Sequence, residues 1–158
     1  MKNAPWHAHY PKEVPQQIDS AEYESLAELL NDGFKKFGNY PAFENMGKVM
    51  TFNELKIASD SFAAYLIHDL GLNRGDKVAI QMPNLLQYPV VLFGALRAGM
   101  TVVNVNPLYT SSELKHQLND ADVKVIIVLA NFASVLEDIL SETKLKYVVV
   151  TQIGDMIG

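Results

Sequence analysis

The chain has 158 residues, of which 49% are apolar and 20% charged, a profile typical of folded globular proteins and unlike that of disordered ones. Its net charge is −5, and its 13 basic residues are scattered apart from Lys35 and Lys36, which argues against a nucleic-acid partner. It has no Cys, so disulfides, thiolate metal sites and a Cys nucleophile are excluded.

Residues 1–24 are predicted to form an extended N-terminal arm. Pro5, Pro11 and Pro15 each remove a backbone donor and disfavour a helical conformation in the preceding residue. No apolar run follows the N-terminal charge, so a secretory signal is not expected and a cytoplasmic location is the default. The most apolar segment, 85–96, falls short of the roughly 18 residues of a membrane span and is predicted to be a buried helix. Contact with the inner face of a membrane would then be peripheral at most.

Two amphipathic helices are predicted next, over 26–37 and 52–70. We expect the first to end at Gly38 in a left-handed conformation and the second to end at Gly71. The segment between them is predicted to form a hairpin with its turn near Gly47. A hydroxyl residue followed three positions later by Glu predicts a capping box at three helix starts, Ser25 with Glu28, Thr51 with Glu54 and Thr110 with Glu113.

From residue 77 onward, short β-branched runs alternate with helical segments. Strands are predicted over 77–82, 101–105, 124–129 and 146–151, and helices over 85–97, 111–119 and 132–141. This alternation indicates parallel strands, buried on both faces, joined by right-handed helical crossovers. The predicted fold class is α/β, a layered, mostly parallel sheet with helices on both faces. Residues 25–158 are expected to form an incomplete α/β subdomain.

The stretch Gly94–Thr101, GALRAGMT, superficially matches a phosphate-binding loop. Met100 stands where that pattern requires Lys. The order is also wrong, because a phosphate loop follows a strand and precedes a helix, whereas Gly94 ends a predicted helix and Gly99 precedes a predicted strand. We therefore interpret Gly99 as a turn residue that leads into a central strand.

The carboxyl ends of the predicted strands are where an open parallel sheet binds its ligands. The residues at these ends are neutral: Pro83, Asn84, Asn104, Asn106 and Asn131. The same loops contain no glycine-rich phosphate cradle, no set of carboxylates for a metal and no G-x-S-x-G nucleophile elbow.

Other polar residues are better explained by structural roles. The histidines, His7, His9, His68 and His116, lack a ligand pattern and are predicted to lie on the arm or the surface. Asp120 and Asp122 are expected to be solvated turn residues. The hydroxyls of residues 110–112 are interpreted as helix caps, with weak anion binding as the alternative. We therefore predict no catalytic, cofactor-binding or metal-binding residue in this chain.

Two long segments, 50–66 and 75–128, carry a family resemblance. The sequence TFNEL at 51–55, the sequence LRAG at 96–99 and the blocks NPLYT and ELKHQL within 106–118 are similar to the start of bacterial long-chain fatty acyl-CoA synthetases. These enzymes belong to the adenylate-forming superfamily, and the resemblance covers nearly the whole chain.

The resemblance implies a reaction in two steps. A fatty carboxylate attacks the α-phosphate of ATP, with Mg2+, to give acyl-adenylate and pyrophosphate, and the CoA thiol then displaces AMP. The family's phosphate loop, its nucleotide, metal and ribose contacts, its hinge and its C-terminal Lys lie farther along such proteins. The chain is therefore expected to be an N-terminal portion of the large domain, inactive alone, with the remainder of the parent chain as its partner and no ATP, Mg2+ or CoA bound to this portion.

A second hypothesis is a stand-alone, truncated α/β interaction module without catalysis. The reading frame after Gly158 discriminates between the two. The resemblance also makes residues 1–40 a candidate surface for homo-oligomer contact.

Overall fold

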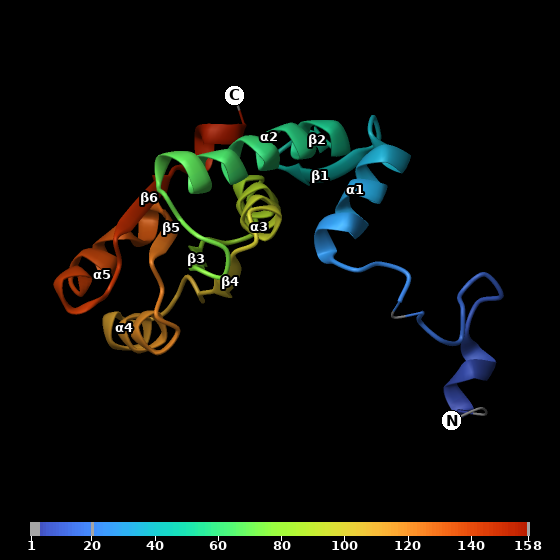
Figure 1. Cartoon of the computed structure of the whole chain (residues 1–158), viewed down its shortest axis with the longest axis horizontal. Coiled ribbons are helices and arrows are strands. Elements are labelled where there is room, and N and C mark those ends of the chain that lie inside the picture. The colour runs from blue at the N-terminus through green and yellow to red at the C-terminus, as the bar shows by residue number, and fades with distance from the viewer. Residues whose placement is uncertain (1–3, 20, 158) are drawn as a thin grey trace.

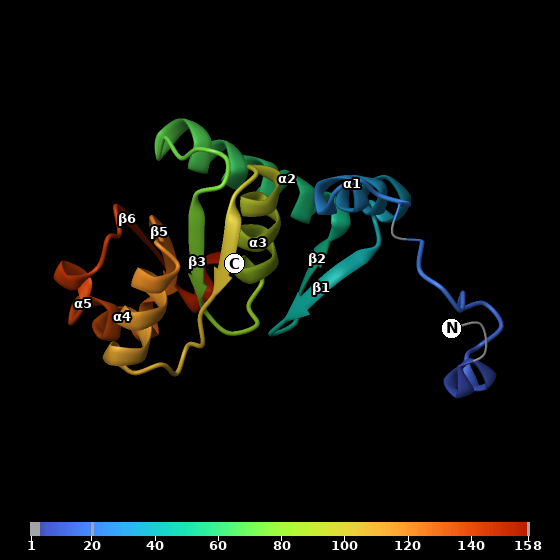
Figure 2. The same ribbon diagram turned by 60° about the horizontal axis from the view of Figure 1, so that its bottom comes forward.

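The computed structural model describes residues 4–19 and 21–157. Its centre is a four-stranded parallel sheet in the order β4-β3-β5-β6. The strands are β3 Lys77–Gln81, β4 Thr101–Asn104, β5 Val125–Leu129 and β6 Tyr147–Thr151. A separate antiparallel hairpin, β1 Pro41–Asn45 and β2 Lys48–Thr51, lies beside the sheet rather than in it (Figure 2).

Helices cover both faces of the sheet (Figure 1). Helix α3 lies against one face with α2 packed across it, and α4 and α5 lie against the other face. Their bounds are α1 Leu26–Phe37, α2 Phe52–Ala64, α3 Gln87–Arg97, α4 Ser111–Asp120 and α5 Ala133–Glu137. The layered α/β fold with a parallel sheet is confirmed.

The alternation of side chains along each strand divides the core into two layers. Val78 and Ile80 of β3 pack under α3, whereas Ala79 between them packs under α4. Strand β5 divides in the same way and is buried along its whole length. Helices on both faces require strands that are apolar at every position, which is the pattern that β3 and β5 show.

The two outer strands are less buried than predicted. Strand β4 was expected to be central, yet it has a neighbour on one side only and exposes Thr101 and Asn104. Strand β6 is the opposite edge, where Val150 is 52% exposed. The prediction of burial on both faces was therefore right for β3 and β5 and wrong for β4 and β6, because strand order is not encoded in the composition of a single strand.

Two helices are shorter than their apolar periodicity predicts. The one expected over 52–70 changes after Ala64 into a π turn, Tyr65–Asp69, in which Leu70 N–H donates to the Tyr65 carbonyl at 3.1 Å. The one expected over 132–141 is α-helical only in α5 and is flanked by the 3-10 turns Ala130–Phe132 and Leu140–Glu142. A repeat of apolar residues predicts which face of a helix is buried. It does not determine whether the backbone hydrogen bonds span three residues, as in a 3-10 helix, four, as in an α-helix, or five, as in a π-helix.

Two of the three predicted capping boxes are complete. Thr51 and Thr110 each accept from the N–H of the Glu three residues on, and each Glu bonds back to the cap's own N–H. At α1, Ser25 accepts from Glu28 N–H at 3.2 Å, but the Glu28 carboxylate bonds Glu24 N–H instead. The prediction of a reciprocal box at Ser25 was therefore wrong.

Gly38 ends α1 for a different reason from the one predicted. Its φ of −29° is not left-handed. A Cβ at this position would lie 2.8 Å from Oδ1 of Asn53, in the first turn of α2. A side chain at this position would therefore displace the Asn53 side chain, whereas the backbone conformation itself does not require glycine.

The N-terminal segment extends away from the rest of the molecule (Figure 1). Within it, Pro5–His9 form a 3-10 helix. Tyr23 donates from its hydroxyl to Asp32 of α1 at 2.7 Å, which attaches the end of this segment to α1. Over the described residues, no helix combines the length and apolar character needed to cross a bilayer.

Candidate functional site

The carboxyl edge of the sheet is where this fold would bind a ligand. Strand β4, which follows β3 in the chain, lies on one side of β3 in the sheet. The chain then crosses back over β3, and β5 lies on its other side. The carboxyl ends of β3 and β5 therefore form the topological switch point, at which open α/β sheets open a crevice.

Neutral amide side chains lie at this edge, and several of them bond a tyrosine hydroxyl or backbone groups. Asn104 accepts from the Tyr88 hydroxyl at 2.9 Å through its side chain and from Gln117 Nε2 at 3.0 Å through its carbonyl. Asn45 Nδ2 of the hairpin donates to the Asn84 carbonyl at 3.1 Å. Asn106 accepts from the backbone N–H of Leu108 at 3.0 Å. These contacts hold the loops in place.

Gln87 connects α3 to the end of β6. It is 6% exposed, and its Nε2 donates to the Gln152 carbonyl at 2.7 Å and to Thr151 Oγ1 at 3.4 Å. The carboxylate of Asp155 accepts from Gln152 N–H at 2.8 Å and from Thr151 Oγ1 at 2.9 Å. These hydrogen bonds lower the pKa of Asp155, and the one from the Gln152 N–H has a larger effect than the one from the Thr151 hydroxyl. This carboxylate is thus engaged as a turn cap.

The described residues do not fit a divalent cation. Hard cations such as Mg2+ prefer several carboxylate oxygens, and residues 4–19 and 21–157 hold no group of three or more His, Cys, Asp or Glu side chains placed to bind a metal. His9, His68 and His116 are exposed and lie on different elements. Asp120 ends α4 and Asp122 follows it, and both are exposed at the amino edge of the sheet.

The GALRAGMT stretch is a helix-to-strand turn, as predicted. Gly94 lies inside α3, where an added Cβ would be 2.9 Å from both Phe62 Cδ1 and the Ser59 carbonyl of α2. Gly99 has a φ of 76°, in the left-handed region, and Met100 behind it is 5% exposed. The glycines therefore serve packing and chain reversal.

The hydroxyls at the start of α4 are engaged in structural contacts. Thr110 caps the helix through Glu113, and the backbone N–H of Thr110 lowers the pKa of that Glu. Ser111 Oγ donates to Asp138 at 3.3 Å. A carboxylate thus already occupies the position where the alternative reading would have an anion bind.

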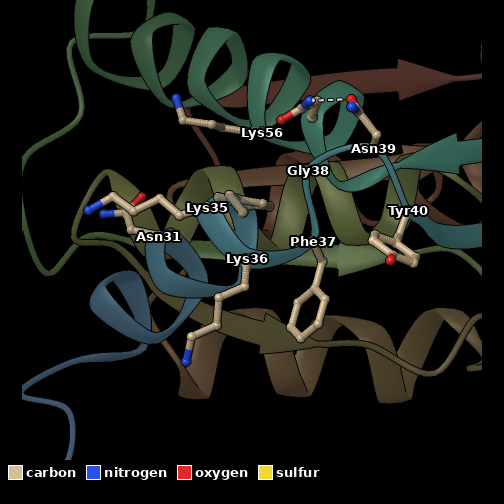
Figure 3. A pocket seen from close by; sticks show the side chains of 10 residues that line it. Asn31, Lys35, Lys36, Phe37, Gly38, Asn39, Tyr40 and Lys56 are labelled. Atoms are coloured by element: carbon tan, nitrogen blue, oxygen red, sulfur yellow. Dashed lines mark hydrogen bonds between the residues drawn. The ribbon is translucent and has the colours of Figure 1, made fainter.

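A hollow of about 640 Å³ lies between α1 and α2 and carries lysines (Figure 3). Figure 3 shows Lys35, Lys36 and Lys56 pointing in different directions rather than toward one point. Lys36 pairs with Asp32 and Lys56 with Asp60, each at 2.7 Å. The Asn53 and Asn39 side chains bond across its upper end at 3.0 Å. The hollow is the seam between two helices rather than an anion site.

A smaller apolar groove of about 260 Å³ lies between the hairpin, α2 and the C-terminal turn. Ile57 on its rim is 66% exposed and Val49 is 40% exposed. We call it the α2 groove, and its lining residues are Lys48, Val49, Met50, Glu54, Ile57, Ala58, Leu86 and Met156.

Similarity to known proteins identifies the family of this chain. The family described as AMP-binding enzyme matches residues 30–156. The chain belongs to the AMP-binding enzyme family. Within it, the chain is 53% identical over 153 residues to the long-chain-fatty-acid–CoA ligase of Salmonella typhimurium and 51% identical to that of Escherichia coli O157:H7. Each match covers 97% of this chain and 27% of the relative.

A solved structure supports the same assignment. The long-chain-fatty-acid–CoA ligase of Archaeoglobus fulgidus superposes with a TM-score of 0.76 at 26% identity, covering 88% of this chain and 30% of that one. The chain spans about a quarter of the length of the curated relatives it matches.

Sequence reasoning missed one feature of the carboxyl edge. Gln81 ends β3 at the switch point and is fully buried with both amide atoms lacking a partner among the described residues. The sequence does mark this residue, because Gln81 is the one polar residue in the otherwise apolar run VAIQM at 78–82.

Proposed function

We propose that these residues form the N-terminal portion of a long-chain fatty-acid CoA ligase. The whole enzyme would convert ATP, a fatty acid and CoA into acyl-CoA, AMP and pyrophosphate. The observation that carries the proposal is 53% identity over 97% of the chain to a long-chain-fatty-acid–CoA ligase. The match to the AMP-binding family over residues 30–156 supports it.

The residues of this portion would act as scaffold. Asn104 and Gln87 bond a hydroxyl and a backbone carbonyl at the carboxyl edge, and the Asp155 carboxylate caps a turn, so these groups hold loops rather than activate a carboxylate or a thiol. The residues that bind ATP, Mg2+ and CoA would come from the remainder of the whole enzyme. That remainder is the main partner of this portion, and a fatty acid is the substrate of the whole.

The same proposal gives the surroundings of the protein. We place the ligase in the cytoplasm, with peripheral contact at the inner membrane face through its lipid substrate. Residues 1–40 form a candidate contact between copies, because Trp6, Leu26 and Leu29 are 54%, 58% and 44% exposed.

The test compares the whole gene product with residues 1–158 in an assay for acyl-adenylate from ATP and palmitate. We expect turnover by the whole protein and a signal equal to the enzyme-free blank from residues 1–158. Activity of residues 1–158 above the blank would contradict the scaffold role, and an inactive whole protein would contradict the ligase assignment. A stop codon directly after Gly158 would favour the interaction module.

A further inference from the structure

The amide of Gln81 is the most unusual polar group in the described core. Its residue exposure is 0%, and neither Oε1 nor Nε2 has a hydrogen-bond partner within residues 4–19 and 21–157. A buried polar group without a partner is costly, so a native fold that keeps one has a partner for it.

The direction of the Gln81 side chain follows from strand alternation. Ala79, two residues earlier on β3, packs in the layer under α4, so Gln81 faces the same layer. Its neighbour on one side is Val128, by register, and on the other is Val105, whose N–H bonds the Ile80 carbonyl. Both neighbours are apolar and offer no side-chain partner.

Gln117 supplies a second unpartnered atom in the same layer. It lies on α4 between the fully buried Leu114 and Leu118, and its Nε2 donates to the Asn104 carbonyl at 3.0 Å. Its Oε1 is buried and has no partner among the described residues. Asn104 is the β4 residue paired with Ile80, so Gln117 sits over the end of β4 next to Gln81.

We propose that a buried water site lies beneath α4, between Gln81 and Gln117. The bridging water accepts from Gln81 Nε2 and donates to Gln117 Oε1, and Gln81 Oε1 accepts from a second water. Buried waters characteristically bond two to four otherwise unsatisfied groups, and Gln81 and Gln117 together carry three such atoms at the adjoining ends of β3 and β4. The site would connect α4 to the carboxyl end of β3 at the switch point.

Thermal unfolding of the whole protein tests the bridge through a double-mutant cycle. Gln81→Met and Gln117→Met keep side-chain volume and remove the polar atoms. We expect each to lower Tm by about 1–3 °C. The double variant should lower it by less than the sum of the two, because both lose the same water, whereas the bond from Gln117 to the Asn104 carbonyl is lost only with Gln117. Gln17→Met on the exposed N-terminal segment is the control and should leave Tm unchanged.

Two outcomes overturn the proposal. A raised or unchanged Tm in Gln81→Met would mean that the amide is truly unpartnered, since an apolar replacement then removes a penalty. Additive losses would mean two independent sites. If Gln81→Met does not fold, a high-resolution crystal structure of the unsubstituted protein still decides. We expect a water oxygen about 2.7–3.2 Å from both amides, and a direct amide-to-amide bond at that place would contradict the site.

Discussion

At the residue scale, Asp76 forms an ion pair that is largely protected from water. It lies just before β3, and its carboxylate contacts Lys124 Nζ at 2.6 Å and accepts from Asn73 N–H at 2.8 Å. The Asp76 side chain is only 13% exposed. The pKa of Asp76 is lowered, mainly by the hydrogen bond from the Lys124 ammonium. Burial acts in the opposite direction and raises this pKa, and the Asn73 N–H lowers it further.

The lowered pKa gives a pH-dependent contribution to stability. A carboxyl whose pKa is lower in the folded than in the unfolded state stabilises the fold above its unfolded pKa of about 3.9, and that contribution disappears as the pH falls through the folded pKa. We expect Asp76→Asn to reduce the free energy of unfolding by about 1–3 kcal/mol at pH 7. Urea denaturation at several pH values should show the difference from wild type narrowing below about pH 4.

Asp122→Asn is the matched control for this prediction. Asp122 also pairs with a lysine, Lys144, at 3.0 Å, but the two side chains are 55% and 68% exposed. Exposed pairs contribute little because water screens them. A difference for Asp76→Asn that stays constant from pH 7 to pH 2, or an equally large effect of Asp122→Asn, would contradict the role of the protected pair.

At the element scale, the crossing of α2 over α3 depends on Gly94. An added Cβ would lie 2.9 Å from the Ser59 backbone carbonyl, which cannot move without α2. Ser59 itself is fully buried, with its hydroxyl donating to the Lys56 carbonyl at 3.1 Å. The two helices can thus pack at this distance only because residue 94 has no side chain.

We expect Gly94→Ala to lower the free energy of unfolding by about 1–3 kcal/mol, the usual cost of overpacking, as measured by urea denaturation. Gly33→Ala is the control, because an added Cβ there meets nothing within 4 Å. In a helix interior, alanine is also more stable than glycine by about 1 kcal/mol. Gly33→Ala should leave stability unchanged or raise it. Equal effects of the two substitutions would show that backbone entropy, and not the helix crossing, governs position 94.

At the scale of the whole molecule, exposed apolar surface is the main feature. The α2 groove and the open edge strand β6 together expose Ile57, Val49 and Val150 by 66%, 40% and 52%. Surface of this kind favours association unless another part of the protein covers it, and an open strand edge can pair with another strand.

We expect isolated residues 1–158 to self-associate as the concentration rises, as measured by light scattering. Ile57→Gln should reduce the association because it places an amide on the rim of the α2 groove. Ile18→Gln is the control, since Ile18 is 91% exposed on the N-terminal segment, outside the groove. A concentration-independent monomer, or equal effects of both substitutions, would contradict a role for the groove.

Sequence alone predicted the local features of this protein. The β-branched runs gave the four strands, Gly47 gave the hairpin turn, and Thr51 and Thr110 gave two capping boxes, because each depends on a few neighbouring residues. The family assignment also came from contiguous blocks and is confirmed. The absence of catalytic residues remains a prediction.

Tertiary structure decided what depends on residues distant in sequence. Strand order made β4 an edge, the fold placed the Asn53 side chain against Gly38, and the packing of α4 over β3 buried Gln81. GALRAGMT shows both kinds of information. Its order and its missing Lys excluded a phosphate loop from sequence alone, whereas the need for Gly94 followed only from the α2 backbone lying against it, a contact between segments about 35 residues apart.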